Sequence, residues 1–326
     1  MRFKGHVDMS QSIFGTWSDQ DAQLWGHVPR HYNHNLHQHP LFSAESLGAL
    51  IDRFPRSHYS LIQMGAQGGR RFWREGDLAG MKGQDVLKWI AAGRMWINLR
   101  TVQTVDPRYK DLLEEIYDQI ASQTGTGSTF NLSMGILVSS PMAQVYYHAD
   151  MLGQTLWQIA GRKRVYVYPN HAPFLTQEQL EDIAFYEVEV DTPYQPWYDQ
   201  HAQVFELAPG MMAHWPLNAP HRVENLDMLN ISVTTEHMDA EILRSYRVTL
   251  ANAVLRKTFG MRNLSPHSRG LAYRVKSAVQ GLARRSSWLK TARKERRPIE
   301  FMLDPSVPGG VIDVASQSSR PLSSAA

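Results

Sequence analysis

The chain of 326 residues contains no cysteine. Disulfide bonds, iron–sulfur clusters and thiolate-bound zinc are therefore excluded, and any metal site must be built from His, Asp, Glu or water. No stretch approaches the roughly 18 consecutive apolar residues that are typical of a transmembrane helix, and the N-terminus lacks the apolar run of a signal peptide. We therefore expect a cytoplasmic protein without a transmembrane segment, and its 43% hydrophobic residues are enough to form a globular core.

Acidic residues are nearly missing from one region of the chain. Residues 244–298 contain 15 Lys or Arg but one acidic residue, Glu295, although the formal net charge of the whole chain is only +3. Charge separated in this way usually marks a distinct surface or tail rather than a catalytic pocket. The region also contains an apolar stripe at helical spacing, formed by Leu271, Val275, Ala278, Val279 and Leu282.

This basic helical region has two interpretations. Its apolar stripe can pack against the core or against a second subunit, which predicts a homodimer through the C-terminal helices with a solvated basic face. Alternatively, a basic amphipathic helix can lie on an anionic membrane surface or on an acidic partner. Contact with nucleic acid is favoured less, because few aromatic residues interleave with the charges.

The spacing of apolar residues divides the chain into helical and strand-rich parts. It predicts helices over residues 43–54, 85–92 and 107–120 and a strand over 95–99. After Thr129, short runs of branched and aromatic residues alternate with Gly and Pro, which predicts an antiparallel sandwich or barrel. The predicted strands are 130–138, 143–150, 155–160, 164–168, 186–190, 203–207, 211–214, 221–224 and 229–235.

Four regions follow from these patterns. We expect an α/β region over residues 1–125 that packs on the core, and a β-rich core over 126–237. The basic helical region follows over 238–300. Residues 301–326 are rich in Ser, Pro and Gly, so we expect a disordered tail.

The motif His148-Ala149-Asp150 is a candidate metal site within the β-rich core. Residues two apart on a strand point to the same face of the sheet. One further ligand from a distant strand would complete two imidazoles and one carboxylate on one side of a metal, the arrangement of non-haem Fe(II) oxygenases. The alternative is a hydrogen-bonded pair in a polar pocket.

Lys163 follows in a turn between two predicted strands. If Lys163, Val165 and Val167 share an inward face, the lysine is a buried cation that needs an anionic partner, such as one carboxylate of a dicarboxylate co-substrate. Alternatively, Lys163 lies in water beside Arg162 and Arg164.

A third landmark is the segment from Gly210 to His221, in which a Gly turn, a strand and a Pro-bounded loop lead to a histidine. Together the three landmarks resemble the Jumonji-C or cupin-like Fe(II)- and 2-oxoglutarate-dependent oxygenases. The resemblance is strongest to the branch containing the asparaginyl hydroxylase that inhibits hypoxia-inducible factor. It covers residues 130–235, and more loosely 43–120. It implies His221 rather than His214 as the third ligand, and Lys163, fifteen residues after His148, as the co-substrate lysine.

The sequence departs from this family at the co-substrate pocket. Many relatives carry a Thr where this chain has Val145, and Trp96 lies where relatives place a tyrosine. Tyr146 has the strand parity of His148 and is one candidate for a co-substrate hydroxyl. Asn131 and Thr234 are the other two candidates.

The resemblance implies a double-stranded β-helix core of the cupin or Jumonji-C type, with an α/β N-terminal layer and C-terminal helices. It also implies a 2-oxoglutarate-dependent Fe(II) dioxygenase that consumes O2 and releases succinate and CO2. Such an enzyme would hydroxylate a peptide, a protein or an amino-acid-derived small molecule. The alternative function is a non-catalytic cupin-fold protein that binds or senses a metal or ligand.

Overall fold

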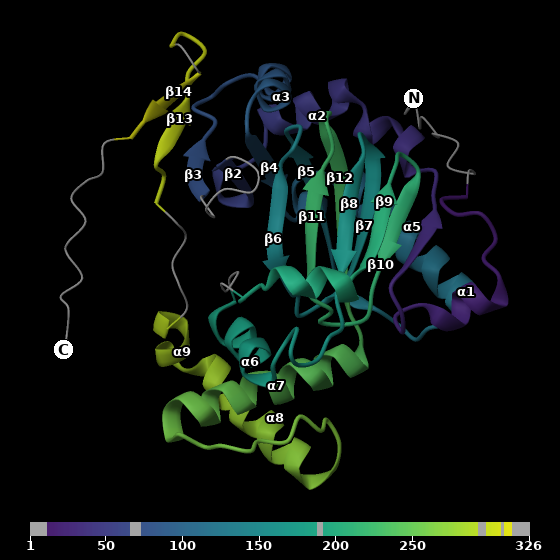
Figure 1. Cartoon of the computed structure of the whole chain (residues 1–326), viewed down its shortest axis with the longest axis vertical. Helices are drawn as coiled ribbons and strands as arrows, with labels where there is room; N and C mark the ends of the chain where they lie inside the picture. The colour runs from purple at the N-terminus through teal and green to yellow at the C-terminus, as the bar shows by residue number, and fades with distance from the viewer. Residues whose placement is uncertain (1–11, 66–72, 188–191, 293–297, 308–309, 315–326) are drawn as a thin grey trace, which may run out of the picture.

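The computed structural model describes residues 12–65, 73–187, 192–292, 298–307 and 310–314. Figure 1 shows a central β core with the last four helices gathered at one end of it. The core consists of eight strands: β5 (Phe130–Ser139), β6 (Gln144–His148), β7 (Gly153–Ala160), β8 (Lys163–Val167), β9 (Gln203–Leu207), β10 (Met211–His214), β11 (His221–Asn225) and β12 (Asn230–Met238).

The order of these strands defines the fold. One sheet contains the order β10-β7-β12-β5 and the other the order β6-β11-β8-β9, and every pairing is antiparallel. The chain therefore crosses repeatedly between two facing sheets, as in a double-stranded β-helix. Leu156 and Ala213 from the larger sheet pack against Val165 and Val223 from the smaller one. The predicted fold is confirmed, although the two sheets remain separate and do not close into one barrel.

N-terminal strands extend the larger sheet, which has ten strands among the described residues. Beyond β5 lie β4 (Met95–Leu99), β2 (Tyr59–Met64) and β3 (Trp73–Asp77), and beyond β10 lies β1 (Arg30–Asn33). The predicted strand over 95–99 is thus confirmed. Its alternate residues Trp96 and Asn98 face the interior between the two sheets, because they pair with Ser139 and Leu137 of β5.

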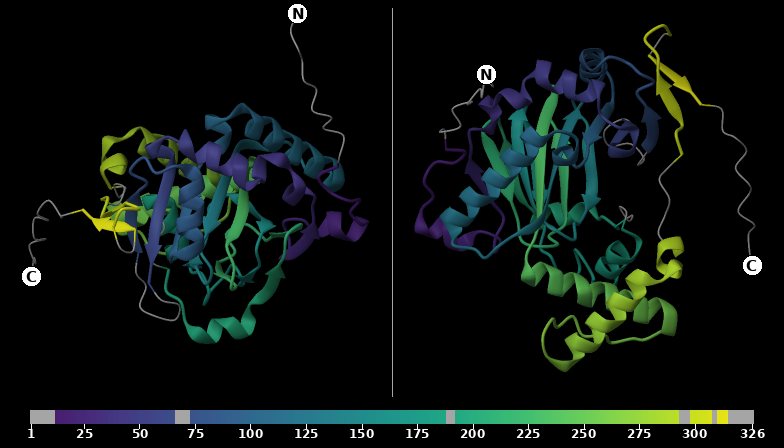
Figure 2. Two further views of the ribbon diagram at one scale, coloured as in Figure 1. Left: turned by 90° about the horizontal axis from the view of Figure 1, so that it is seen from above. Right: turned by 180° about the vertical axis from the view of Figure 1, so that it is seen from behind.

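Helices cover the outer face of the larger sheet, and Figure 2 shows them from above and from behind. They are α1 (Asp19–Leu24), α2 (Ala44–Asp52), α3 (Gly83–Ala92), α4 (Val102–Val105) and α5 (Pro107–Thr124). Apolar side chains such as Ile116 of α5, Ile136 of β5 and Trp157 of β7 share one buried cluster.

Local sequence sets the helix ends. The Ser43 hydroxyl accepts a hydrogen bond from the backbone N–H of Ser46, and Asp106 caps α5 ahead of Pro107. All three predicted N-terminal helices are therefore confirmed.

The C-terminal helices are α6 (Gln177–Tyr186), α7 (Ala240–Phe259), α8 (Gly270–Arg285) and α9 (Ser287–Ala292). They share an apolar cluster that includes Phe185, Leu250, Ala283 and Leu289. Helix α6 lies between β8 and β9 in sequence but joins this bundle, because it packs on α7.

Two local predictions are wrong. Tyr186 ends α6 instead of beginning a strand, and the rest of the strand predicted over 186–190 lies largely outside the described residues. Part of the expected disordered tail forms β13 (Phe301–Leu303) and β14 (Val311–Asp313), and β13 pairs with β3. Phe301 is fully buried, so its burial against Gly76 outweighs the polar composition around it. Residues 315–326 lie outside the described part, and the four region boundaries stay predictions.

Candidate metal centre

Two neighbouring strands bring the candidate ligands together. His148 ends β6, His221 begins β11, and the two residues are paired directly across the strands. Their ring centroids are 4.2 Å apart. Asp150 lies two residues after His148, just beyond the end of the strand. One ligand atom from each residue lies within 4.8 Å of the others, so the structure brings together all three residues that the sequence singled out.

Backbone carbonyls orient both imidazoles. The Nδ1 atom of His148 lies 2.6 Å from the carbonyl oxygen of Tyr146, and that of His221 lies 3.1 Å from the carbonyl oxygen of Ala219. A carbonyl only accepts hydrogen bonds, so each Nδ1 carries a proton, and in a neutral ring Nε2 is left as a lone pair. This is the tautomer that a metal-binding histidine with a second hydrogen-bond partner adopts.

The carboxylate of Asp150 faces one of these lone pairs. Its Oδ2 atom lies 3.3 Å from Nε2 of His221. Burial, together with the neighbouring His148, lowers the pKa of His221 to about 4, so this contact is not an ion pair near neutral pH. Asp150 Oδ2 is also buried and has no hydrogen-bond partner among the described residues. Two acceptors that face each other without a proton between them repel, and a metal cation in that position would remove the repulsion. The residues therefore fit a divalent metal.

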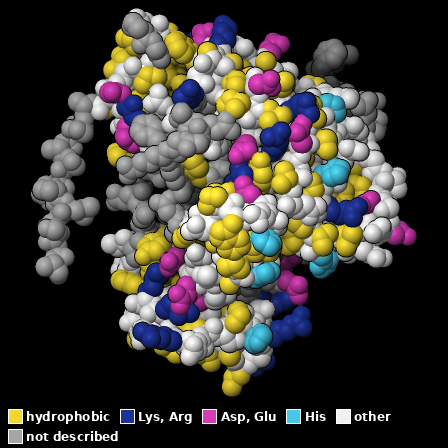
Figure 3. Space-filling model, viewed as in Figure 1, with side chains coloured by type: hydrophobic (Ala, Val, Ile, Leu, Met, Phe, Trp, Pro, Cys, Tyr) yellow, Lys and Arg dark blue, Asp and Glu magenta, His cyan; other side chains and the backbone are white. Residues whose placement is uncertain are grey.

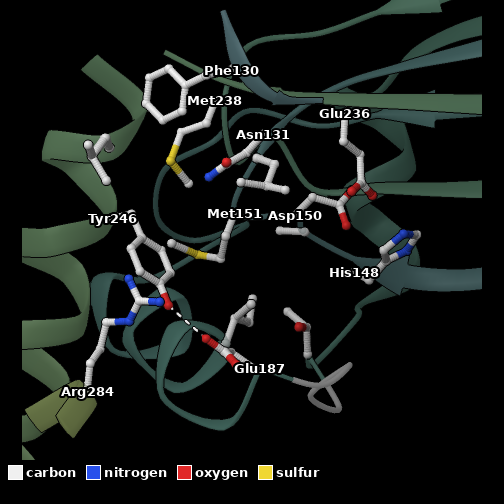
Figure 4. A pocket seen from close by; sticks show the side chains of 15 residues that line it. Phe130, Asn131, His148, Asp150, Met151, Glu187, Glu236, Met238, Tyr246 and Arg284 are labelled. Atoms are coloured by element: carbon white, nitrogen blue, oxygen red, sulfur yellow. Dashed lines mark hydrogen bonds between the residues drawn. The ribbon is translucent and has the colours of Figure 1, made fainter. Parts of the chain in front are cut away.

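A cavity of about 690 Å³ opens on His148 and Asp150 (Figure 4). It lies between the end of the β core and the C-terminal helices, and the Tyr246 hydroxyl donates a 2.9 Å hydrogen bond to Glu187 across its wall. Its lining is mostly apolar and includes Phe130, Met151, Leu152, Ile183, Met238 and Leu243. Arg284 of α8 also lines it.

Glu236 is a site residue that the sequence analysis missed. It extends from β12 toward Asp150 in Figure 4. Burial and the charge of Asp150 raise the pKa of Glu236 to about 7, against the opposing effect of a hydrogen bond with Gln154. Strand parity could have found it, because Glu236 lies two residues after Thr234 and so shares its inward face.

Lys163 lies in the interior between the sheets. Lys163 is 3% exposed, and Val165 and Val167 on the same face of β8 are 0% and 1% exposed. Lys163 therefore faces the interior, as one of the two alternatives predicted, and it does not lie in water beside Arg162 and Arg164. Among the described residues the Lys163 ammonium has no hydrogen bond or ion pair, and burial lowers its pKa to about 7. It lies four residues along β8 from Val167, which pairs with His221, a backbone span of roughly 13 Å.

The strand parity predicted for Tyr146 is wrong, but its role as a co-substrate donor stays a prediction, because Tyr146 still packs in the cluster that contains Trp96. The pairing of β6 with β11 shifts register between the pairs His148–His221 and Val145–Val223, so β6 contains a bulge. The extra residue moves Val145, and not Tyr146, to the inward face shared with His148, and Val145 packs against the interior cluster. The Tyr146 ring lies 5.6 Å from that of Trp73 instead.

The other two candidates, Thr234 and Asn131, lie in different parts of the molecule. Thr234 pairs with Gly135 on the inward face, and a Cβ at Gly135 would lie only 2.8 Å from the Thr234 hydroxyl, so glycine is what allows this hydroxyl to lie so close to β5. Asn131 is exposed and lines the outer cavity. It therefore lies on the side of the metal ligands away from Lys163.

Two further polar groups of the interior are unpaired. Nε1 of Trp96 and the amide oxygen of Asn98 are buried and have no hydrogen-bond partner among the described residues. The Asn98 oxygen would lie 3.4 Å from a Cβ at Gly135, beside the Thr234 hydroxyl. Buried polar groups without partners cost free energy, so this interior fits a polar ligand better than it fits an empty apolar core.

His214 takes a structural position. It lies on the outer face of β10 and stacks on Trp25, with ring centroids 3.7 Å apart and an interplanar angle of 3°. Its Nδ1 atom lies 2.9 Å from the carbonyl oxygen of Gln154. His214 is therefore on the opposite face of the sheet from the candidate ligands.

The chain is similar to several solved structures, but it matches no sequence family. No protein-family model and no curated protein matches the chain. Similar solved structures include Escherichia coli YcfD, at 16% identity and a TM-score of 0.45, covering 91% of this chain and 77% of that one. They also include E. coli YcfD, a ribosomal oxygenase, in complex with cobalt and 2-oxoglutarate, at 16% identity and a TM-score of 0.45, covering 90% and 76%.

A more distant match is the DMSP lyase DddQ from Ruegeria pomeroyi DSS-3. It is 14% identical with a TM-score of 0.22, and the match covers 34% of this chain and 40% of the lyase. A ribosomal oxygenase bound to 2-oxoglutarate is thus among the structures similar to this chain, and the narrower likeness to an asparaginyl hydroxylase stays a prediction. Likeness at this level assigns no function to the chain.

None of the helices in the described part of the chain combines the length and the apolarity needed to cross a membrane.

Proposed function

We propose that the chain is an Fe(II)- and 2-oxoglutarate-dependent oxygenase that hydroxylates a peptide, protein or amino-acid-derived substrate. His148, Asp150 and His221 would be the metal ligands. The observation that carries the proposal is the unpaired Asp150 oxygen facing the Nε2 lone pair of His221. Two neutral imidazoles and one carboxylate on one side of a metal suit Fe(II) and leave other positions open.

The interior would hold the co-substrate. Bound Fe(II) and 2-oxoglutarate together would supply the oxidising chemistry, with succinate and CO2 as co-products. Lys163 is the buried cation to which the far carboxylate of 2-oxoglutarate would bind. The Trp96 indole N–H and the Thr234 hydroxyl would be further donors, in a pocket where Val145 offers none.

The outer cavity would hold the substrate. Its apolar wall favours burial of an aliphatic or aromatic portion, and water is excluded as that portion enters. Glu236 lies where this cavity meets the metal ligands. Its carboxyl group can therefore orient a polar group of the substrate beside Asp150.

The test is an anaerobic titration of the protein with Fe(II) and 2-oxoglutarate, monitored by the weak visible charge-transfer band of the complex. We expect the band in the wild type and in His201→Ala, a control that replaces an exposed histidine. We expect no band in His148→Ala. A wild type without the band, or a His148→Ala variant that keeps it, contradicts the proposal. Binding without succinate release in the presence of any tested substrate would favour the sensor alternative.

A further inference from the structure

Helix α8 is amphipathic, and its apolar side faces outward. Leu271, Val275 and Leu282 are 77%, 58% and 70% exposed, and their spacing places them on one face of the helix. The buried residues of α8 are Lys276, Gln280 and Ala283. The expectation that the apolar stripe packs against the core is therefore wrong for Leu271, Val275 and Leu282, although Val279 packs against the apolar cluster of the C-terminal helices.

Contacts on the polar face hold α8 in this orientation. The buried Lys276 ammonium donates a hydrogen bond to the backbone carbonyl of Ser265. Tyr273 lies within 3.5 Å of Arg247 of α7, and Ala283 joins the apolar cluster of the C-terminal helices. The helix is thus anchored by polar bonds and by the apolar contacts of Ala283 and Val279, and the side chains of Leu271, Val275 and Leu282 are left for another partner.

Exposed arginines flank the stripe. Arg274 and Arg285 are exposed on α8 beside it, and neither forms an ion pair with a described residue. Arg269 at the start of the helix is 83% exposed in its side chain and pairs with the similarly exposed Glu241. Figure 3 shows hydrophobic and basic side chains next to each other at the end of the molecule that α8 occupies. A basic rim around an apolar stripe selects a partner that is both anionic and apolar.

Three occupants can be compared on charge. A second copy related by a two-fold axis would bring this basic rim against itself, which is repulsive. Nucleic acid would pair with the arginines through its phosphates but would leave the aliphatic stripe without a partner. The surface of an anionic lipid bilayer offers phosphate groups and an acyl boundary at the same depth.

We propose that α8 docks on the surface of an anionic membrane. The Leu271, Val275 and Leu282 side chains enter the boundary between headgroups and acyl chains, and Arg274 and Arg285 contact the lipid phosphates. The association is peripheral.

The test is flotation of the full chain with vesicles of phosphatidylcholine alone and of equal parts phosphatidylcholine and phosphatidylglycerol. We expect binding only to the anionic vesicles, and weaker binding at high salt. Leu271→Asp with Leu282→Asp should lower the affinity at least about tenfold, because two aliphatic contacts are lost. Arg274→Glu with Arg285→Glu should lower it by more than about fivefold per residue.

Met228→Asp is the matched control, because Met228 is 42% exposed outside the C-terminal helices; it should bind like the wild type. Circular dichroism establishes that each variant is folded. The proposal is overturned if the wild type does not bind anionic vesicles. It is also overturned if the Leu271→Asp/Leu282→Asp variant binds them as tightly as the wild type. Light scattering tests the alternative of a dimer. If the wild type is a dimer and the Leu271→Asp/Leu282→Asp variant is a monomer, the stripe binds a second copy of the chain and the membrane proposal is overturned.

Discussion

In the interior of the β core the groups without partners are polar and buried, whereas on α8 they are apolar and exposed. Trp96 and Asp150 each keep a polar atom away from water without a protein partner, and Lys163 is a buried cation without an ion pair. Leu271 and Leu282 instead expose apolar side chains to water. Each arrangement costs free energy in the isolated chain. The unpaired groups of the interior would be satisfied by an ion and a small acid, but the exposed helix face needs an extended surface.

The largest effect is expected at the carboxylate. Asp150→Asn should lower the affinity for divalent metal by more than about a hundredfold, because a charged ligand becomes a neutral amide. The same change should leave the metal-free protein at least as stable, since the amide can donate to Nε2 of His221. Thermal unfolding with and without Co(II) checks both, and a metal-dependent rise in Tm that survives the change would contradict the assignment.

Lys163→Met comes next. It should weaken 2-oxoglutarate binding by about tenfold to a hundredfold, because a hydrogen bond to a charged group is lost. It should also raise the free energy of unfolding of the ligand-free protein by roughly 1–3 kcal/mol, because a buried unpaired cation is removed. Isothermal titration calorimetry and urea unfolding measure the two effects. A destabilised Lys163→Met would mean that the ammonium has a favourable partner in solution.

The pH dependence of 2-oxoglutarate binding follows from the same lysine. Its pKa is lowered to about 7, so the ammonium is charged below that pH and becomes neutral above it. Affinity for the dicarboxylate should therefore fall as pH rises through about 7, by at most tenfold per pH unit. Glu236 also has a pKa of about 7, so Glu236→Gln is the control. The dependence should persist in Glu236→Gln and vanish in Lys163→Met.

A smaller effect is expected at Trp96. Trp96→Phe keeps an aromatic ring but removes the unpaired Nε1–H donor, so 2-oxoglutarate should bind about threefold to tenfold more weakly. Trp197→Phe, at a residue that is 44% exposed, should bind it normally. Calorimetry checks both. Unchanged affinity in Trp96→Phe would remove this indole from the co-substrate pocket.

The smallest effect is expected for stability on α8. Leu282→Gln should change the free energy of unfolding by less than about 0.5 kcal/mol, since the side chain is already in water. Leu207→Ala in the fully buried interior should cost about 2–5 kcal/mol. Urea unfolding compares the two. A large loss at Leu282 would show that the stripe is covered in solution.

Local patterns predicted much of the fold and part of the site. Alternation and turn residues located the eight core strands, and the His-x-Asp pair was found with its partner His221. Strand parity failed at Tyr146, because one bulged residue reverses which side chains face inward. Asn131 lines the outer cavity, and its candidate role stays a prediction. The orientation of α8 was also missed, because a helical stripe reports a face but not what covers it.

The sequence by itself determined the chemistry that is available: histidine and carboxylate ligands, no thiols, one lysine among valines and one strongly basic helical region. These are properties of residue type and short-range spacing. Only the tertiary structure decided that Asp150 faces the His221 lone pair, that Lys163 is buried without a partner, that Glu236 joins the site, and that α8 shows its leucines to solvent. Those outcomes depend on contacts between segments that are far apart in the chain. Whether one face of a strand or helix is buried depends on which distant segment packs against it.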